Sequence, residues 1–246
     1  MDQLFFERYE MKYLLTLRQR ELLLERLAPN IEPDRYPQGT IRNLYLDTES
    51  FLLARRSAEK PIYKEKLRLR AYTRPEAESD VFLEIKKKYR GVVFKRRVRL
   101  PYGQAMEIAL QRLPAPQTQV GREIAACQAL YGQTLLPRML LSYDREAYRA
   151  REEQDFRLTM DTGIRWRTQE LDLAGELDGR PILPADLVLL ELKTSGPIPL
   201  WMARFLSEQQ IFRRSFSKYG LACSSLLQGQ KKPEENYVGQ VLSKSV

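Results

Sequence analysis

Charged residues that alternate with apolar residues along four segments are the first sign of chemistry in this 246-residue sequence. In a β-strand, residues two apart lie on the same face, so each segment would present its charges together. The charges that would share a face are Lys64, Lys66, Arg68 and Arg70 in residues 64–72; Glu84, Lys86 and Lys88 in residues 81–89; Lys95, Arg97 and Arg99 in residues 92–100; and Glu191 and Lys193 in residues 187–194. Lysine and arginine bind phosphate oxygens, and carboxylates bind hard divalent cations. The pattern therefore indicates a surface for a phosphate-rich anion together with a metal ion.

Each segment taken alone is also consistent with a solvated sheet face, which antiparallel sheets commonly have. Two observations favour a functional interpretation. Like charges opposite one another on adjacent strands repel, yet these segments carry mostly cations, with Glu84 and Glu191 isolated among them. Strands joined by hairpins would also gather the cations into one dense field, which is costly unless a polyanion neutralises it.

Residue types exclude several common kinds of active site. The sequence has no histidine, which excludes histidine general bases, phosphohistidine and histidine-ligated zinc. Its two cysteines, Cys127 and Cys223, lie far apart and in no metal-binding spacing. It has neither a GxxxxGK[ST] loop nor a GxGxxG loop, which argues against P-loop, kinase and Rossmann sites.

The composition is that of a folded and basic protein. Hydrophobic residues make up 43% of the chain, enough for a core, and 41 Lys and Arg against 32 Asp and Glu leave a net charge of +9. Such a surplus predicts an anionic partner: nucleic acid, a nucleotide, another polyanion or a membrane surface. The aromatic residues do not interleave with the cations as in a base-stacking platform, so we expect no nucleic acid. The N-terminus has no signal-peptide pattern, no segment could span a bilayer, and cysteines are few, so we expect a cytoplasmic protein.

The elements that would position these residues are mostly strands. Strands are predicted over residues 40–47, 64–72, 81–89, 92–100, 139–148, 156–161 and 187–194. Helices are predicted over residues 17–27, 102–113 and 200–210, with a further short helix after Ser215. Helices thus lie at the ends and in the connection from residue 100 to 136. We expect an α+β fold with a mainly antiparallel sheet in a single domain, residues 1–228, followed by a flexible polar tail, residues 229–246.

Short motifs in a fixed order make this sequence resemble the CYTH/triphosphate tunnel metalloenzyme superfamily and, within it, the VTC branch, the polyphosphate polymerase domain. The motifs are Arg8–Tyr13 (RYEMKY), Tyr45–Thr48 (YLDT), Lys66–Arg70 (KLRLR), Glu84–Lys88 (EIKKK), Lys95–Arg97 (KRR), Tyr143–Tyr148 (YDREAY), Arg157–Asp161 (RLTMD), Leu190–Lys193 (LELK) and Phe216–Tyr219 (FSKY). Each motif alone is weak, but the ordered set covers nearly the whole chain and is specific.

The resemblance implies an antiparallel β-barrel of about eight strands with flanking helices, whose interior is a triphosphate tunnel. It implies catalytic contacts to phosphates from Lys66, Arg68, Arg70, Lys86, Arg145, Arg157 and Lys218. It implies substrate binding by Lys12, Arg8, Lys88, Lys95, Arg97, Tyr143, Lys193 and Ser217. For Tyr143, packing in the core and contact with substrate are equally favoured interpretations.

The resemblance also implies a divalent metal cofactor, Mn²⁺ or Mg²⁺, held by Glu191. For Glu84 and Glu10, metal binding and ion pairing remain equally open, whereas an ion pair is favoured for Asp161. One departure from the superfamily matters here. Hydrolytic and cyclase members begin with a Glu-x-Glu-x-Lys pattern, but Arg8 stands at the first glutamate, leaving Glu10 and Lys12. One metal-binding carboxylate is replaced by a cation, which favours a transferase over a hydrolase.

The function that the resemblance implies is polyphosphate synthesis from ATP, with ATP and polyphosphate as the bound partners. Three alternatives stay open: a triphosphatase or polyphosphatase that uses the same tunnel, a non-catalytic module that binds polyphosphate or nucleotide, and nonspecific nucleic-acid binding. The eukaryotic polymerases of this branch work beside membrane segments. This chain has none, so it either acts alone or depends on a separate membrane partner.

Overall fold

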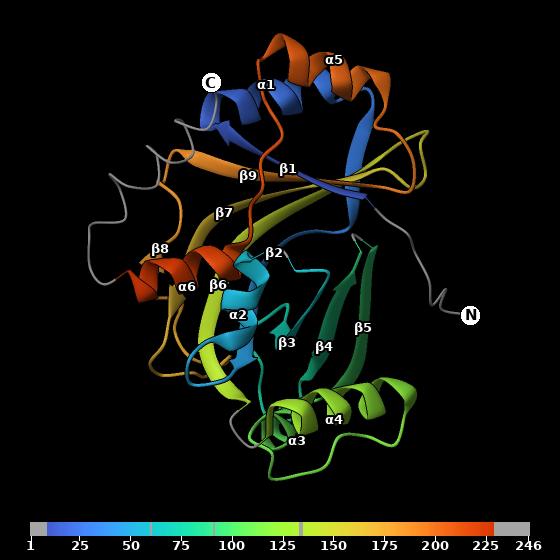
Figure 1. Ribbon diagram of the computed structural model, residues 1–246. Helices are drawn as coiled ribbons and strands as arrows, with labels where there is room; N and C mark the ends of the chain where they lie inside the picture. The colour runs from blue at the N-terminus through green and yellow to red at the C-terminus, as the bar shows by residue number, and fades with distance from the viewer. Residues whose placement is uncertain (1–8, 60, 91, 133–134, 229–246) are drawn as a thin grey trace.

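The computed structural model describes residues 9–59, 61–90, 92–132 and 135–228, and one large sheet dominates it (Figure 1). Its strands are β1 (Tyr9–Thr16), β2 (Ile31–Asp47), β3 (Tyr63–Ala71), β4 (Asp80–Tyr89), β5 (Val92–Pro101), β6 (Leu136–Ala150), β7 (Arg157–Arg167), β8 (Arg180–Pro181) and β9 (Leu187–Thr194). Its helices are α1 (Leu17–Leu27), α2 (Leu52–Ala58), α3 (Tyr102–Ala109), α4 (Gln119–Tyr131), α5 (Leu200–Glu208) and α6 (Lys218–Leu227). Within the described residues, no helix has the length and apolar character needed to cross a membrane.

The strands form one antiparallel sheet in the order β1-β9-β7-β6-β2-β3-β4-β5, with β8 paired to β7. This confirms the predicted fold class. The described strands do not close into a barrel through backbone hydrogen bonds, because β1 and β5 lie at the two ends of the order. The connection between α5 and α6 lies against β1 instead, where the Arg214 amide donates to the Lys12 carbonyl at 2.7 Å. The sheet nevertheless curves far enough that Glu10 of β1 forms an ion pair with Lys86 of β4.

Local sequence explains most of the elements. Helix α1 begins at a capping box, in which Thr16 and Gln19 each bond the other's backbone amide, and it ends just before Pro29. Helix α3 is shorter than predicted, because Gln111 adopts a left-handed φ of 58° that stops the helical turn. The short helix α2 was not predicted, because its cap is the Asp47 carboxylate, which accepts the Leu53 and Ala54 amides from the end of β2.

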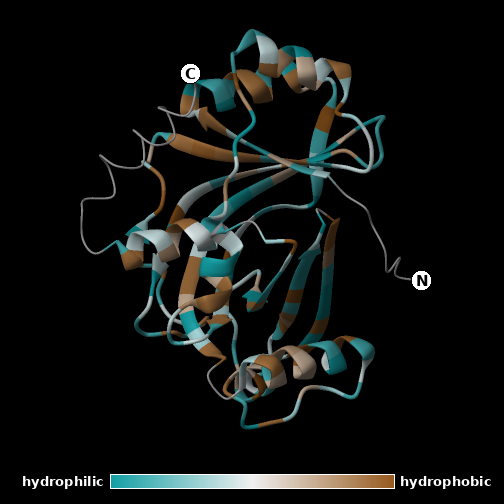
Figure 2. Ribbon diagram, viewed as in Figure 1, coloured by the Kyte–Doolittle hydropathy of each residue, from teal (hydrophilic) through white to brown (hydrophobic). Residues whose placement is uncertain are grey.

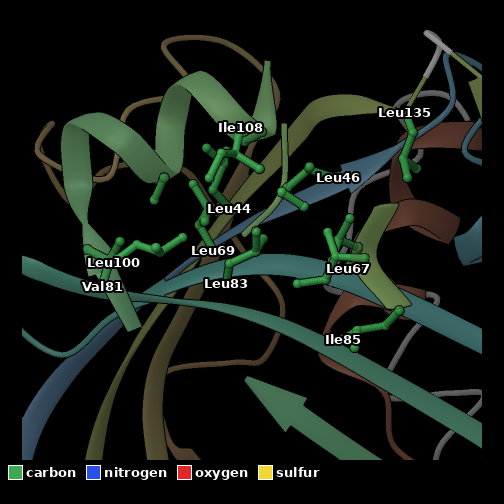
Figure 3. Close-up of a cluster of buried hydrophobic side chains, with 14 of the residues drawn as sticks. Leu44, Leu46, Leu67, Leu69, Val81, Leu83, Ile85, Leu100, Ile108 and Leu135 are labelled. Atoms are coloured by element: carbon green, nitrogen blue, oxygen red, sulfur yellow. The ribbon is translucent and has the colours of Figure 1, made fainter. Parts of the chain in front are cut away.

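Two apolar clusters cover the outer face of the sheet. One packs α3 and α4 against β2 to β5 and contains Leu44, Leu69, Leu83 and Ile108 (Figure 3). The other packs α1 and α5 against β1, β7 and β9 at the opposite end of the molecule (Figure 1). Since these clusters use the apolar residues of each alternating strand, the charged residues must lie on the inner face. Figure 2 shows the resulting alternation of hydrophilic and hydrophobic colour along β4 and β5.

A third cluster fills part of the inner face. Helix α6 packs Tyr219 and Cys223 there against Tyr45, Leu141 and Ile164, together with α2. The Tyr45 and Tyr219 rings stack with centroids 4.1 Å apart, and the Tyr219 hydroxyl donates to Asp47 at 2.6 Å. This packing fixes the N-terminal end of α6 beside the inner-face charges.

Candidate functional site

The register of β3, β4 and β5 arranges the inner-face charges in rows across the sheet. Arg68 lies opposite Glu84, which lies opposite Arg97. The row on one side consists of Lys66, Lys86 and Lys95, and beyond it stand Lys64, Lys88 and Val93. The row on the other side consists of Arg70, Phe82 and Arg99. The alternation in sequence thus becomes a continuous cationic wall, as the sequence predicted.

Glu84 is the buried counterion of this wall, with 1% of its surface exposed. Arg68 donates to its Oε2 from Nε at 2.9 Å and from Nη2 at 2.8 Å. Lys95 Nζ lies 2.7 Å from its Oε1. Burial alone would raise the pKa of this carboxyl, but the neighbouring arginines and Lys95 hold the pKa well below its ordinary value. Because cations face both oxygens, the geometry supports the ion-pair interpretation of Glu84. We call Glu84, Arg68, Arg70 and Lys95 the arginine cluster.

A second cluster lies across the interior on β6, β7, β9 and α6. Arg145 donates two hydrogen bonds to Asp161, at 2.6 and 2.7 Å, so the ion pair expected for Asp161 is present. Lys218 Nζ lies 2.5 Å from Asp161 and 2.9 Å from Glu191. Lys193 and Arg145 each approach Glu191 Oε2 at 3.3 Å. We call Glu191, Asp161, Arg145, Lys193 and Lys218 the lysine cluster.

The charges of the lysine cluster stabilise one another. Burial alone would raise the pKa of Glu191, but Lys218, Lys193 and other nearby cations hold the pKa far below its ordinary value. Conversely, burial alone would lower the pKa of Lys218, but Asp161 and Glu191 raise this pKa above its ordinary value. Glu191 and Lys218 are therefore charged at neutral pH, whereas burial lowers the pKa of Lys193.

Tyr143 of β6 links the two clusters and is buried, with 3% exposed. Arg70 Nη2 lies 3.3 Å from its hydroxyl, while Arg145 and Lys218 lie 5.1 and 4.6 Å from its ring centroid. Burial alone would raise the pKa of this phenol, but the three cations lower the pKa overall. Tyr143 thus packs in the core, as one interpretation expected, and its hydroxyl faces the charged interior, while its contact with substrate stays a prediction.

The N-terminal end of α6 adds amide donors to the interior. Ser217 caps this helix, its Oγ accepting the Gly220 amide at 3.1 Å and a hydrogen bond from Lys66 Nζ at 3.0 Å. Lys12 Nζ donates to the Phe216 carbonyl at 3.0 Å. A helix N-terminus beside two lysines is a favourable place for an anion.

Lys66 is an inner-face cation whose charge should depend on a ligand; burial also lowers the pKa of Lys95 to about 7, but Lys95 has Glu84 beside it. Burial and then the nearby Lys86, Lys12, Lys64 and Arg68 lower the pKa of Lys66 to about 7, and no carboxylate is among the groups that shift this pKa most. Without a bound anion, this amine is therefore close to half protonated at neutral pH. A phosphate group would favour its charged form.

Glu10 and Glu191 are the carboxylates best placed to hold a divalent ion. Strand pairing sets Glu10 opposite Lys193 and Lys12 opposite Glu191, so the two carboxylates are diagonal neighbours on one face. Lys12 and Lys86 lie 3.2 and 3.3 Å from Glu10 and, against the opposing effect of burial, hold its pKa below its ordinary value. The described part of the chain contains no group of three acidic or cysteine side chains that could hold a metal alone. Substrate phosphates would complete the coordination, as is common for Mg²⁺.

A cavity of about 740 Å³ opens at the end of the interior near Lys64 and Lys88. Glu10, Lys12, Lys66 and Lys86 line it from the strands, and Ser217 and Gly220 line it from α6. Arg213 and Arg214 also line it, and sequence analysis did not predict them. They lie on the irregular connection between α5 and α6, which has no alternating pattern of charged and apolar residues. Their position just before the FSKY motif could have indicated them.

The remaining predicted residues lie at the margins. Arg157 shares a face with Thr159 and Asp161 and lies opposite Lys193, but its side chain is 45% exposed, at the rim. Arg97 stacks on the Phe82 ring at 4.3 Å. Arg8 lies outside the described residues, as does the tail over residues 229–246.

Comparison with known proteins gives one matching family and several similar structures. The profile of the VTC domain matches residues 7–227. A candidate adenylate cyclase from Bacillus halodurans superposes with a TM-score of 0.52 and 17% identity, over 86% of this chain and 96% of that chain. A candidate adenylate cyclase from Vibrio parahaemolyticus gives a TM-score of 0.47 and 11% identity, over 88% and 98% of the two chains. A Mimivirus capping-enzyme triphosphatase gives 0.31 and 10%, over 82% and 86%. No curated protein matches the sequence.

Proposed function

The chain belongs to the VTC domain family, and from that premise we propose that it transfers the γ-phosphate of ATP to a growing polyphosphate chain. The observation that carries this proposal is the excess of inner-face cations over carboxylates. The cations are Lys12, Lys66, Arg68, Arg70, Lys86, Lys95, Arg97, Arg145, Lys193 and Lys218, and the carboxylates are Glu10, Glu84, Asp161 and Glu191. A field of this kind matches an anion that carries several phosphates in a row.

The chemistry requires no general base from the protein. The terminal phosphate of the acceptor chain is already anionic, and its oxygen attacks the γ-phosphorus of ATP. One P–O–P bond forms as the bond to the β-phosphate oxygen breaks, and ADP leaves. Lys218, Arg145 and Lys66 would neutralise the charge of the transferred group and hold donor and acceptor in line. This explains how a protein without histidine could catalyse the reaction.

We propose that Glu10 and Glu191 hold Mn²⁺ or Mg²⁺ with the help of substrate oxygens. The bound ion would neutralise further phosphate charge. Glu84 is better placed as a counterion, because cations lie 2.7 and 2.8 Å from its two oxygens, whereas the cations at Glu10 lie 3.2 and 3.3 Å away and those at Glu191 Oε2 lie 3.3 Å away.

One observation favours a second candidate function. Two neighbouring carboxylates could place a metal ion so that it activates water, and the tunnel would then be a triphosphatase or polyphosphatase. The two reactions differ in product, so one assay separates them.

We would incubate the purified chain with γ-labelled ATP and Mn²⁺, with and without a short polyphosphate primer, and resolve the products on a gel. The proposal predicts a ladder of polyphosphate that is lost in Glu191→Gln and Lys218→Ala. Lys87→Met is a matched control, because Lys87 lies on the outer face of β4 beside Glu123 and should leave the ladder intact. Free phosphate alone would support hydrolysis, and intact ATP would overturn both enzymatic functions in favour of a binding module.

A further inference from the structure

An aromatic surface lies at the end of the inner face opposite the cavity. We infer that Tyr72 stacks against the base of a nucleoside triphosphate whose phosphates occupy the charged interior. This inference rests on the proposed function, because it needs those phosphates bound between the two clusters. It adds a recognition site for the nucleoside and a direction for the substrate.

Tyr72 directly follows β3, and its contacts with Arg70 and Phe82 place its ring beside the inner face. Its ring meets the Phe82 ring edge-on, with centroids 5.7 Å apart and an angle of 79°. Arg97 lies 4.3 Å over Phe82, and Arg70 lies 5.9 Å from the Tyr72 ring centroid. Phe82 and Arg70 thus contact the Tyr72 ring from the interior, while 41% of the residue is exposed. Such a supported but open ring is suited to stacking with a base.

The other inner-face tyrosines do not offer an open ring. Tyr143 is buried between cations, and Tyr45 and Tyr219 are stacked on each other. At the cavity end, Tyr63 and Tyr89 are exposed but occupy the outer face, since Lys64 and Lys88 take the inner positions. Tyr9 is the rival, because it is 62% exposed and lines the cavity.

Distances along β3 agree with this placement. Arg70 and Arg68 precede Tyr72 by two and four residues, so they lie roughly 7 and 14 Å from it along the strand. The phosphates of a nucleotide stacked on Tyr72 would therefore run from Arg70 past Arg68 towards Lys66. The terminal phosphate would point to the cavity, and the acceptor chain would occupy the Lys64–Lys88 end.

The test compares two ligands that share phosphates but differ in the base. Isothermal titration calorimetry would measure the affinity of the full chain and of Tyr72→Ala for ATP and for tripolyphosphate. Loss of one stacked base should weaken ATP binding by about 10-fold, and tripolyphosphate binding should stay unchanged. Tyr72→Trp should restore ATP binding, because stacking needs an aromatic face rather than a hydroxyl. Tyr89→Ala is the control, being an exposed tyrosine on the outer face.

Several outcomes would overturn the inference. An equal loss of affinity for ATP and for tripolyphosphate would show that Tyr72 supports the arginine cluster rather than binding the base. Unchanged ATP affinity would show that the base is not held there, and selective loss in Tyr9→Ala would place it at the opposite end. If the unaltered chain binds tripolyphosphate but makes no polymer, the polymerase proposal fails. The comparison of ATP with tripolyphosphate would then still test whether Tyr72 stacks against the base. If the unaltered chain binds neither ligand, both proposals fail.

Discussion

Binding of a phosphate chain should draw a proton onto Lys66. The free amine has a pKa lowered to about 7, by burial and by the neighbouring cations. A bound phosphate supplies the missing negative charge at the position where Lys66 now donates to Ser217. Binding should therefore return the pKa towards its ordinary value, and the complex should hold more protons than its separate components.

The size of this uptake follows from the two pKa values. At pH 8 an amine with a pKa of about 7 is about one-tenth protonated, whereas one near the ordinary value of 10.5 is almost fully protonated. Lys66 should thus contribute about 0.9 proton per ligand bound at pH 8. Because binding takes up protons, affinity should decrease as the pH rises above 7, by up to about tenfold per pH unit from this group.

Calorimetric titration with tripolyphosphate at pH 8, in two buffers of different ionisation enthalpy, measures the uptake. Lys66→Arg keeps the cation but cannot lose its proton, so the uptake should decrease by about 0.9 proton. Lys218→Arg is the control, because the raised pKa of Lys218 keeps it protonated with or without ligand. Lys95 and Lys193, whose pKa values burial also lowers, should take up protons in both chains, so the test is the difference in uptake between the two chains. The same uptake in the original chain and in Lys66→Arg would refute the reasoning.

Three further predictions concern stability. Glu84→Gln leaves buried cations without their counterion and should lower the free energy of unfolding by about 3–5 kcal/mol in urea titration. An unchanged free energy of unfolding would show that solvent screens the arginine cluster. Tyr219→Phe removes the hydrogen bond to Asp47 and should cost about 1–2 kcal/mol in the same titration, and no change would show that ring stacking alone holds α6. Thr16→Ala removes the cap of α1 and should lower the free energy of unfolding by about 1 kcal/mol without changing the affinity for tripolyphosphate. A changed affinity would show that α1 contributes to the binding site.

Much of the architecture could be predicted from the sequence. Every strand predicted from alternation or β-type composition is present, because a curved sheet with helices outside and charges inside imposes a period of two. Helix α1 was predicted with its observed ends because Thr16 and Pro29 act locally. Strands β1 and β8 and helices α2 and α4 were not predicted from pattern. Strand β1 is partly buried on both faces, β8 has two residues, and α2 depends on the Asp47 cap.

The sequence by itself determined which residues carry charge, that they would share one face, and that the fold is α+β. Only the tertiary structure decided how those charges are paired, because pairing depends on contacts between strands far apart in the chain. Glu84 pairs with Arg68, and Glu191 with Lys218 of a distant helix. The same contacts set the protonation of Lys66 and bring Tyr72 beside Phe82. Charge type is a property of each residue, but burial and distance, which set its pKa and its partners, exist only after the sheet has curved.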